Sequence, residues 1–250
     1  ETGFSSFRLQ STALLRHLAS WGFVVASPDH PSRDLSAQLG AANEQAPGAV
    51  DDLRSTRTLV ENAATSGPLA GTIDPTRLVL AGHSAGGSTV LEMADDTGVL
   101  GYIAFATGAR EAALPDAPSL FMAGANDGII APVETTDAFA RATSPSWIWT
   151  IADAGHLAFS DLCAIGTGGG GLVGLAEAAG IAELVPENLR RLATDGCLEP
   201  NRRVQEVWPV VHHATTVFAR AITGDPELAV ALDENPIETV GVDVSVNIGP

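Results

Sequence analysis

The chain has 250 residues, of which 45% are hydrophobic and 17% are charged, and its formal net charge is −17. This length and composition predict one globular domain over residues 1–250 with a large buried core. All 13 basic residues are arginines, against 30 acidic residues, and this excess of acid argues against nucleic acid or an anionic membrane as the main partner. No apolar run is long enough to span a bilayer, and no signal peptide is visible.

The first third of the chain predicts two helices on either side of a short strand. Apolar residues at helical spacing over residues 9–18 indicate the first helix, which Gly22 ends. Residues 23–26 form an apolar run typical of a buried strand. Residues 34–48 are small and polar and predict a surface excursion, and residues 50–64 predict the second helix.

The middle of the chain alternates between strands and helices. Strands are expected at residues 78–82, 99–106, 119–123 and 146–151, with helices from Ser84 to about Gly98 and over residues 135–142. Such alternation predicts an α/β fold with a mostly parallel sheet and helices on both faces. In sheets of this kind the functional residues lie at the carboxyl ends of the strands.

Residues 157–200 interrupt this alternation and are expected to form a lid or cap. They contain a glycine-rich run, residues 166–171, and two helical stretches over 172–179 and 186–194. The run lacks the Lys-Ser/Thr of a phosphate loop, so a flexible connection is the better interpretation. Beyond it, the pattern predicts a long amphipathic helix over 202–222 and an edge strand in the Val-rich tail, residues 240–248.

One motif indicates nucleophilic chemistry. An apolar strand ends in Gly82-His83-Ser84-Ala85-Gly86, which fits the G-x-S-x-G pattern, and a helix-like segment follows. The two glycines leave room for a sharp turn that exposes the Ser84 hydroxyl. The backbone N–H of Ala85 then points to where an oxyanion would form. The alternative is a Gly-rich turn with an incidental serine.

Two further residues complete a candidate triad. Asp127 and His156 each follow a predicted strand, so the chain order is Ser84, Asp127, His156, as expected for an α/β-hydrolase. Ser84 would be the nucleophile, His156 the general base and acid, and Asp127 the carboxylate that orients the imidazole. Asp153 and Asp161, both close to His156 in sequence, remain alternatives to Asp127.

The other histidines do not suggest a second site. His83 lies inside the turn and is expected to line the substrate cleft, whereas His212 and His213 lie on the closing helix and are expected to be structural. His17 and His30 have no role that the pattern indicates. No group of histidines, cysteines and carboxylates has metal-ligand spacing, so we expect neither a metal nor any other cofactor.

The two cysteines, Cys163 and Cys197, flank the glycine-rich segment. A disulfide between them would stabilise the fold by about 3–4 kcal/mol in the chain-entropy model. The alternative is two free thiols in a cytoplasmic enzyme. We favour the disulfide, and with it a secreted or extracytoplasmic protein.

Residues 1–160 resemble a group of known hydrolases. Gly3-Phe4, the segment 18–25, the motif 82–87 and the loop 126–132 are similar to bacterial cutinases and polyester hydrolases, platelet-activating-factor acetylhydrolases and dienelactone-hydrolase-like proteins. The resemblance implies that Phe4 supplies the second oxyanion N–H and that its ring lines the acyl pocket. It also implies that the first strands of the fold precede residue 1, or that another segment, such as the Val-rich tail, takes their place.

The chain departs from the cutinase pattern at three places. Thr107-Gly108 stands where polyester hydrolases carry an aromatic residue, Ala85 stands where many cutinases have Met, and the 157–200 segment is longer. The sequence therefore favours a serine esterase or lipase for short to medium acyl esters, with a small-molecule or polymeric substrate. A cutinase-like polyester hydrolase or an acetylhydrolase-like lipase is the alternative, followed by an amidase, a thioesterase or a non-catalytic binding protein.

Overall fold

A five-stranded sheet forms the centre of the computed structural model, which describes residues 1–37, 45–108, 113–143, 145–165, 171–234 and 241–249. The strands are β1 (Leu78–His83), β2 (Val99–Phe105), β3 (Ser119–Gly124), β4 (Ser146–Ile151) and β5 (Val244–Ile248), in that spatial order. The first four are parallel, and β5 pairs antiparallel with β4. The predicted α/β class with a mostly parallel sheet is confirmed.

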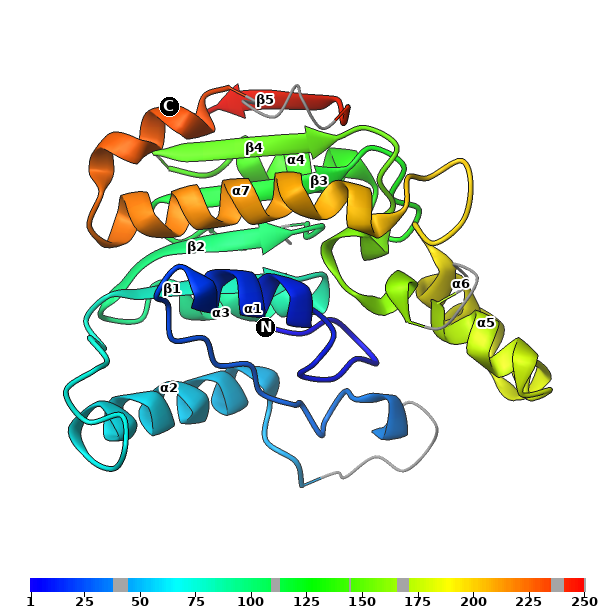
Figure 1. The fold of residues 1–250 in the computed structure, drawn as a ribbon, viewed down its shortest axis with the longest axis horizontal. Coiled ribbons are helices and arrows are strands. Elements are labelled where there is room, and N and C mark those ends of the chain that lie inside the picture. The colour runs from blue at the N-terminus through cyan, green and yellow to red at the C-terminus, as the bar shows by residue number, and fades with distance from the viewer. Residues whose placement is uncertain (38–44, 109–112, 144, 166–170, 235–240, 250) are drawn as a thin grey trace.

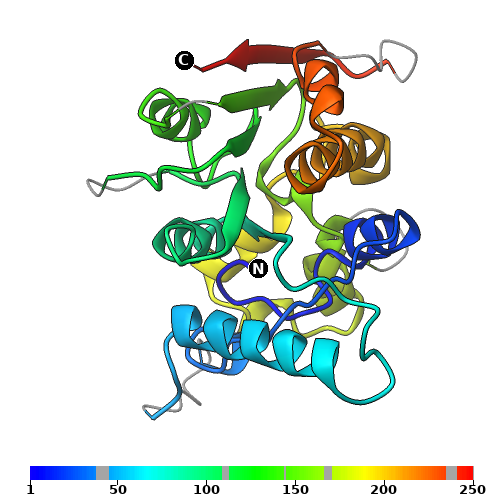
Figure 2. The ribbon, with the colours of Figure 1, turned by 90° about the vertical axis from the view of Figure 1, so that its left-hand side faces the viewer.

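Helices cover both faces of this sheet. Figure 2 shows α3 (Ala85–Met93) and α4 (Pro132–Phe139) on one face and α1 (Thr12–Ser20) and α7 (Val204–Thr223) on the other. A further helix, α2 (Ala49–Thr65), packs against α3. Burial from both sides explains why all six residues of β3 are buried and why the strands read as apolar runs.

Two aromatic side chains of β4 anchor the sheet to the segment that follows α7. The Trp149 indole donates a hydrogen bond to the Leu232 carbonyl at 3.0 Å, and the Trp147 indole donates to Asp233 Oδ1 at 2.8 Å. Both acceptors lie at the end of the 3₁₀ helix η5 (Pro226–Leu232). A buried tryptophan needs such a partner, so these bonds fix how the C-terminal part of the chain closes over β4.

The predicted strand at residues 23–26 is wrong. These residues form no strand, and their side chains are half-buried or exposed. In the described sheet β1 is the terminal strand and pairs with β2. The 23–26 segment therefore has no strand beside it to accept its ladder of hydrogen bonds, and an apolar run alone does not make a strand.

The Val-rich tail forms the predicted edge strand, although residues 235–240 and 250 lie outside the described residues. Its suggested place in a gap beside β1 is wrong, because β5 pairs with β4 at the opposite edge of the sheet. Beside β1 lies the start of the chain instead, where the Glu1 nitrogen donates to the Ala81 carbonyl at 2.7 Å and His83 N–H donates to the Glu1 carbonyl at 3.3 Å.

The segment over residues 157–200, called the insertion below, extends beyond the carboxyl ends of the parallel strands (Figure 1). Its elements, with the turn that leads into it, are η2 (His156–Phe159), η3 (Leu162–Ala164), α5 (Gly171–Ala178), η4 (Ala182–Leu184) and α6 (Glu187–Thr194). The two predicted helices are confirmed. Of the glycine-rich run, residues 166–170 lie outside the described residues, as do residues 38–44 of the predicted surface excursion.

Candidate active site

Ser84 occupies a strained turn between β1 and α3, with φ 57° and ψ −122°. Such a conformation costs a non-glycine residue about 1–3 kcal/mol and is held only by its surroundings. Here a Cβ on Gly82 would lie 2.3 Å from the Gly86 carbonyl oxygen, and one on Gly87 would lie 1.8 Å from Thr107 Oγ1. Glycine at these positions is what lets the chain turn so sharply and carry Ser84 at the start of α3.

Asp127 and His156 meet at the carboxyl edge of the sheet. Asp127 follows β3 and His156 opens η2 after β4, and His156 Nδ1 lies 2.8 Å from Asp127 Oδ2. Both side chains are 1% exposed. The other carboxylate oxygen, Oδ1, accepts the N–H groups of Ile129 and Ile130 at 2.8 Å each. These bonds fix the carboxylate from both sides, so it presents Oδ2 to the imidazole.

The hydrogen bond to Asp127 also fixes the tautomer of His156. A carboxylate oxygen accepts, so Nδ1 carries the proton and Nε2 is left with its lone pair. His156 Nε2 is buried and has no hydrogen-bond partner among the described residues. His156 and Ser84 line the same cavity. Nε2 is therefore an unpaired basic nitrogen in a cavity that Ser84 also lines, and a general base needs such a free lone pair.

The alternative carboxylates lie elsewhere. Asp161 Oδ2 accepts the Ala13 N–H at 2.8 Å at the start of α1, and its burial raises the pKa of that carboxyl. Asp153 is half exposed and lies 3.7 Å from Arg202 in an ion pair. Of the three acidic residues that the sequence offered, the structure brings Asp127 to His156.

The start of the chain crosses the Ser84 turn. A Cβ on Gly3 would lie 3.6 Å from Ser84 Cβ, and one on Gly86 would lie 2.6 Å from the Thr2 carbonyl oxygen. Phe4 follows directly, lines the same cavity as Ser84 and is 43% exposed. Ala85 is the first residue of α3, where the backbone N–H has no acceptor within the helix. Phe4 and Ala85 thus both lie beside Ser84.

His83 lines the cavity but is only 4% exposed. Its Nε2 lies 2.9 Å from the His156 carbonyl oxygen and therefore donates, and its Nδ1 lies 3.5 Å from Gln10 Nε2 and accepts. Gln10 Oε1 in turn accepts the Gly3 N–H at 3.3 Å. Burial, and then the nearby His156, hold the pKa of His83 well below its ordinary value. A neutral His83 thus ties the His156 turn to the start of the chain.

The remaining histidines lie away from this site. His17 on α1 stacks on His212 of α7 with ring centroids 4.5 Å apart, and His213 lies beside Trp149. His30 Nδ1 lies 2.9 Å from Asp52 Oδ2 under the start of the chain. No group of three or more metal-ligating side chains occurs in the part of the chain that the structure describes.

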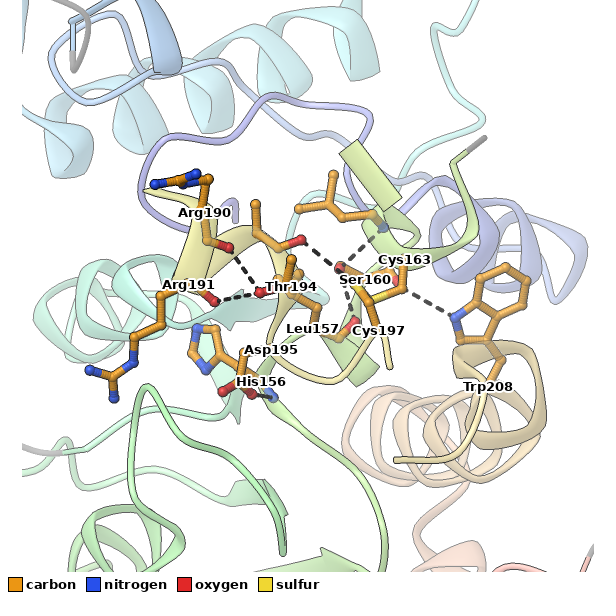
Figure 3. Close-up of a disulfide and its surroundings, with 12 residues drawn as sticks. His156, Leu157, Ser160, Cys163, Arg190, Arg191, Thr194, Asp195, Cys197 and Trp208 are labelled. Atoms are coloured by element: carbon orange, nitrogen blue, oxygen red, sulfur yellow. Dashed lines mark hydrogen bonds between the residues drawn. A yellow bond between two sulfur atoms is a disulfide. The ribbon is translucent and has the colours of Figure 1, made fainter. Parts of the chain in front are cut away.

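Asp195 belongs to the site although no sequence pattern singled it out. It lies just after α6, and its Oδ1 accepts the His156 N–H at 2.6 Å while its Oδ2 accepts the Gly128 N–H at 3.1 Å. Its carbonyl accepts the Leu157 N–H at 3.0 Å. One carboxylate therefore joins the loop that carries Asp127 to the turn that carries His156. Figure 3 shows Asp195 beside His156.

A disulfide holds the end of the insertion in place. Cys163 and Cys197 are bonded, with their Cα atoms 4.9 Å apart, so the predicted pairing is confirmed. The bond joins the 3₁₀ turns after His156 to the residues that follow Asp195 (Figure 3). The backbones also touch here, because a Cβ on Gly155 would lie 2.5 Å from the Gly196 Cα. The insertion is thus fixed to the His156 turn at its carboxyl-terminal end.

The cavity that Ser84 and His156 line has a volume of about 570 Å³. Gly3, Phe4, Gln10 and His83 lie at its Ser84 end, and the insertion supplies most of the remaining wall. This volume is within the range of about 300–1,000 Å³ that is typical of small-molecule sites. Among the described residues, no helix is long and apolar enough to cross a membrane.

Comparison with known families finds a match over the first part of the chain. A family described as "PETase: PET hydrolase-like" matches residues 2–144, which is more than half of the chain. The matched region contains Phe4, Ser84, Ala85 and Asp127, and it ends before His156 and the insertion. No curated protein matches the chain.

Proposed function

This chain belongs to the PET hydrolase-like family of α/β-hydrolases, which are carboxylic ester hydrolases, and on that premise we propose that it is a serine esterase acting through an acyl-enzyme. The observation that carries the proposal is the buried Asp127–His156 pair, whose unpartnered Nε2 lines the cavity of Ser84. Polyester is the substrate that the family implies. From the sequence we propose, more narrowly, esters of carboxylic acids with short to medium-length acyl chains.

In the proposed reaction, Ser84 Oγ attacks the ester carbonyl carbon while its proton moves to His156 Nε2. The backbone N–H groups of Ala85 and Phe4 stabilise the oxyanion of the tetrahedral intermediate. When the intermediate collapses, the carbon–oxygen bond to the alcohol breaks, and Nε2–H protonates the departing oxygen. A water molecule then gives a proton to Nε2 and attacks the carbonyl carbon of the acyl-serine. When the bond to Ser84 Oγ breaks, Nε2–H returns the proton to Oγ, which releases the acid and restores Ser84 and His156.

Asp127 and Asp195 keep the base in place during these steps. Asp127 Oδ2 holds Nδ1–H and stabilises the imidazolium that forms after proton transfer. Asp195 Oδ1 holds the backbone N–H of the same residue. The imidazole is thus fixed through both its ring and its backbone, so its lone pair need not reorganise when Ser84 attacks.

The disulfide supports a site of action outside the reducing cytoplasm. Disulfides persist in oxidising compartments and are rare where thiols are kept reduced. We therefore propose that the enzyme is secreted or extracytoplasmic. This location agrees with a polymeric or lipid ester as substrate.

The direct test is hydrolysis of p-nitrophenyl acetate and butyrate by wild type and by Ser84→Ala. Loss of the nucleophile should lower kcat by about 10⁴-fold or more. The melting temperature should stay the same or rise slightly, because the substitution removes only the Ser84 hydroxyl and leaves the fold intact. An organophosphate probe should label wild type at Ser84 and leave the variant unlabelled. Equal hydrolysis by both proteins would refute the assignment.

A further inference from the structure

The wall of the cavity opposite Ser84 is aliphatic. It is built largely from the insertion, whose α5 contributes Leu172, Val173 and Ala176 and whose α6 contributes Leu189, Leu192 and Ala193. Leu157 and Leu162 from the turns after β4 complete this side. Polar groups lie at the Ser84 end, so the cavity has one polar end and one apolar end.

In each helix of the insertion the residues that line the cavity lie on one side. The spacing i, i+1, i+4 on α5 and i, i+3, i+4 on α6 places each set on one side of its helix. Charged residues such as Glu177, Arg190 and Arg191 are not among the residues that line the cavity. The two helices thus present apolar side chains to the cavity, although Val173 and Leu189 are largely buried.

The described lining of the cavity contains no Asp, Glu or Arg side chain, although the chain as a whole carries a net charge of −17. Apart from the two histidines, Phe4 contributes the only aromatic ring among the described lining residues. A flat aromatic acid with a second carboxylate would find few rings to stack on and no cation to pair with. A flexible hydrocarbon chain would find aliphatic contacts along the whole wall.

The mouth of the cavity is also apolar. Phe4, Leu35, Leu175, Ile181 and Leu184 all line the cavity and are exposed, Leu184 at 78%. Exposed large hydrophobic side chains that gather in one place mark a binding surface. Here the patch adjoins Ser84, so the ligand that covers it is part of the substrate.

We propose that the insertion forms an acyl-chain pocket and makes the enzyme selective for esters of medium-length aliphatic carboxylic acids over aromatic esters. This inference rests on the proposed serine esterase function and adds the segment that selects the acyl group and the preference over aromatic esters. The family match ends at residue 144, so the selectivity comes from a part of the chain that the match does not cover. The carbonyl lies at Ser84 and the hydrocarbon extends between α5 and α6.

The test compares p-nitrophenyl esters from acetate to palmitate, and p-nitrophenyl benzoate, on three proteins. Wild-type kcat/KM should rise by up to about fourfold for each methylene that enters the pocket, reach a maximum at medium length, and exceed the benzoate value. Ala176→Trp places an indole in the pocket and should lower kcat/KM for octanoate and decanoate at least tenfold more than it lowers kcat/KM for acetate. Ala178→Trp is the matched control on the same helix, because Ala178 is exposed and does not line the cavity.

Circular dichroism and the melting temperature report whether each variant is folded. Should Ala176→Trp fail to fold, Val185→Trp blocks the pocket from a different segment and should give the same loss for long esters. A wild type that prefers benzoate or acetate to octanoate, or variants that lower all esters equally, would overturn the inference. In that case Ser84-dependent acetate hydrolysis would leave the proposed function intact, whereas no Ser84-dependent hydrolysis of any ester would overturn the function itself.

The aliphatic chain could come from a lipid or from an aliphatic polyester, and two substrates separate these sources. Faster release of acid from an emulsified medium-chain triglyceride identifies a lipid ester, and faster release from a polycaprolactone film identifies the polymer. Either result supports an acyl-chain pocket when Ala176→Trp lowers it. Faster release from a poly(ethylene terephthalate) film than from both would refute the pocket.

Discussion

Asp195 shows how a single carboxylate can position two residues of the proposed triad without touching the reacting atoms. Its two oxygens accept N–H groups from His156 and Gly128, which lie on different loops at the ends of β4 and β3. Hydrogen bonds to a charged acceptor contribute about 1.5–3 kcal/mol each. Asp195 therefore acts on Asp127 and His156 through their backbones and is a positioning residue.

Asp195→Asn should lower kcat by about 10- to 100-fold with little change in KM. The amide keeps one acceptor oxygen but turns an NH₂ group toward the second backbone N–H, so one of the two bonds is lost and the loops separate. Loss of one bond of about 1.5–3 kcal/mol corresponds to roughly this range. The measurement is steady-state hydrolysis of p-nitrophenyl butyrate, with circular dichroism to check the fold.

Asp153→Asn is the control for this substitution. Asp153 lies three residues before His156, and its ion pair with Arg202 is exposed, so the change should leave kcat within twofold. A positioning role also predicts that Asp195→Glu, which keeps both acceptors on a longer side chain, recovers part of the activity. Asp195→Asn with wild-type kcat would contradict the role.

At the scale of elements, the insertion is joined to the catalytic loops at its carboxyl-terminal end. The Cys163–Cys197 disulfide, the Asp195 bonds and the contact of Gly155 with Gly196 all lie within a few residues of one another. The helices α5 and α6 lie within the loop that the disulfide closes. The pocket wall and the position of His156 therefore depend on the same short segment.

Replacement of both cysteines by serine should destabilise the protein and lower its activity. The loop spans a sequence separation of 34, for which the chain-entropy model gives about 3–4 kcal/mol, or a fall in melting temperature of about 10 °C for a chain of this size. Calorimetry measures the first effect. The accompanying loss of kcat should exceed the fraction unfolded, because Asp195 is no longer held against His156.

Reduction of wild type gives the matched comparison. Dithiothreitol should lower the melting temperature of wild type toward that of the double serine variant and should leave the variant unchanged. If complete reduction, verified by thiol titration, leaves the activity and melting temperature of wild type unchanged, the other contacts alone hold the insertion.

At the scale of the whole molecule, one buried and two half-buried histidines are expected to make the fold sensitive to acid. Burial lowers the pKa of His83, His212 and His213, and for His212, where the nearby His17 adds to the effect, the value falls to about 4. These rings bind protons in the unfolded chain near pH 6.5 but not in the folded chain. The unfolded state thus binds more protons between pH 6.5 and about 4, so folding stability is fully present above pH 6.5 and is lost as pH falls through this window.

The melting temperature should therefore fall between pH 6.5 and 4, and less steeply in His212→Phe. Phenylalanine keeps a ring between His17 and Trp208, which both stack on His212, but it cannot take up a proton. The net charge of −17 decreases in magnitude as the pH approaches the isoelectric point near 4.5, and this relieves charge repulsion equally in both proteins. The difference between the two pH profiles therefore reports the effect of His212. Parallel pH profiles for wild type and variant would contradict the role of His212.

Much of the fold and of the candidate site could be predicted from local sequence. The four parallel strands are apolar runs because both faces of the sheet are buried. The sharp turn at Ser84 needs glycines within a few residues of it. Asp127 and His156 each follow a strand directly, and parallel strands end at one edge, so their meeting follows from chain order. The disulfide followed from there being two cysteines.

Other features were decided by tertiary structure. Residues 23–26 have a strand-like composition but pair with no strand of the described sheet. The tail pairs with β4, because the packing of α7 and η5 leaves that edge of the sheet open to it. Asp195 and the acyl-chain pocket arise where distant segments meet, and no local spacing encodes such contacts. The sequence by itself therefore determined the chemistry of the site, because its residues follow from short-range patterns. Which carboxylate holds the loops, and which helices enclose the substrate, depended on contacts between residues far apart in the chain.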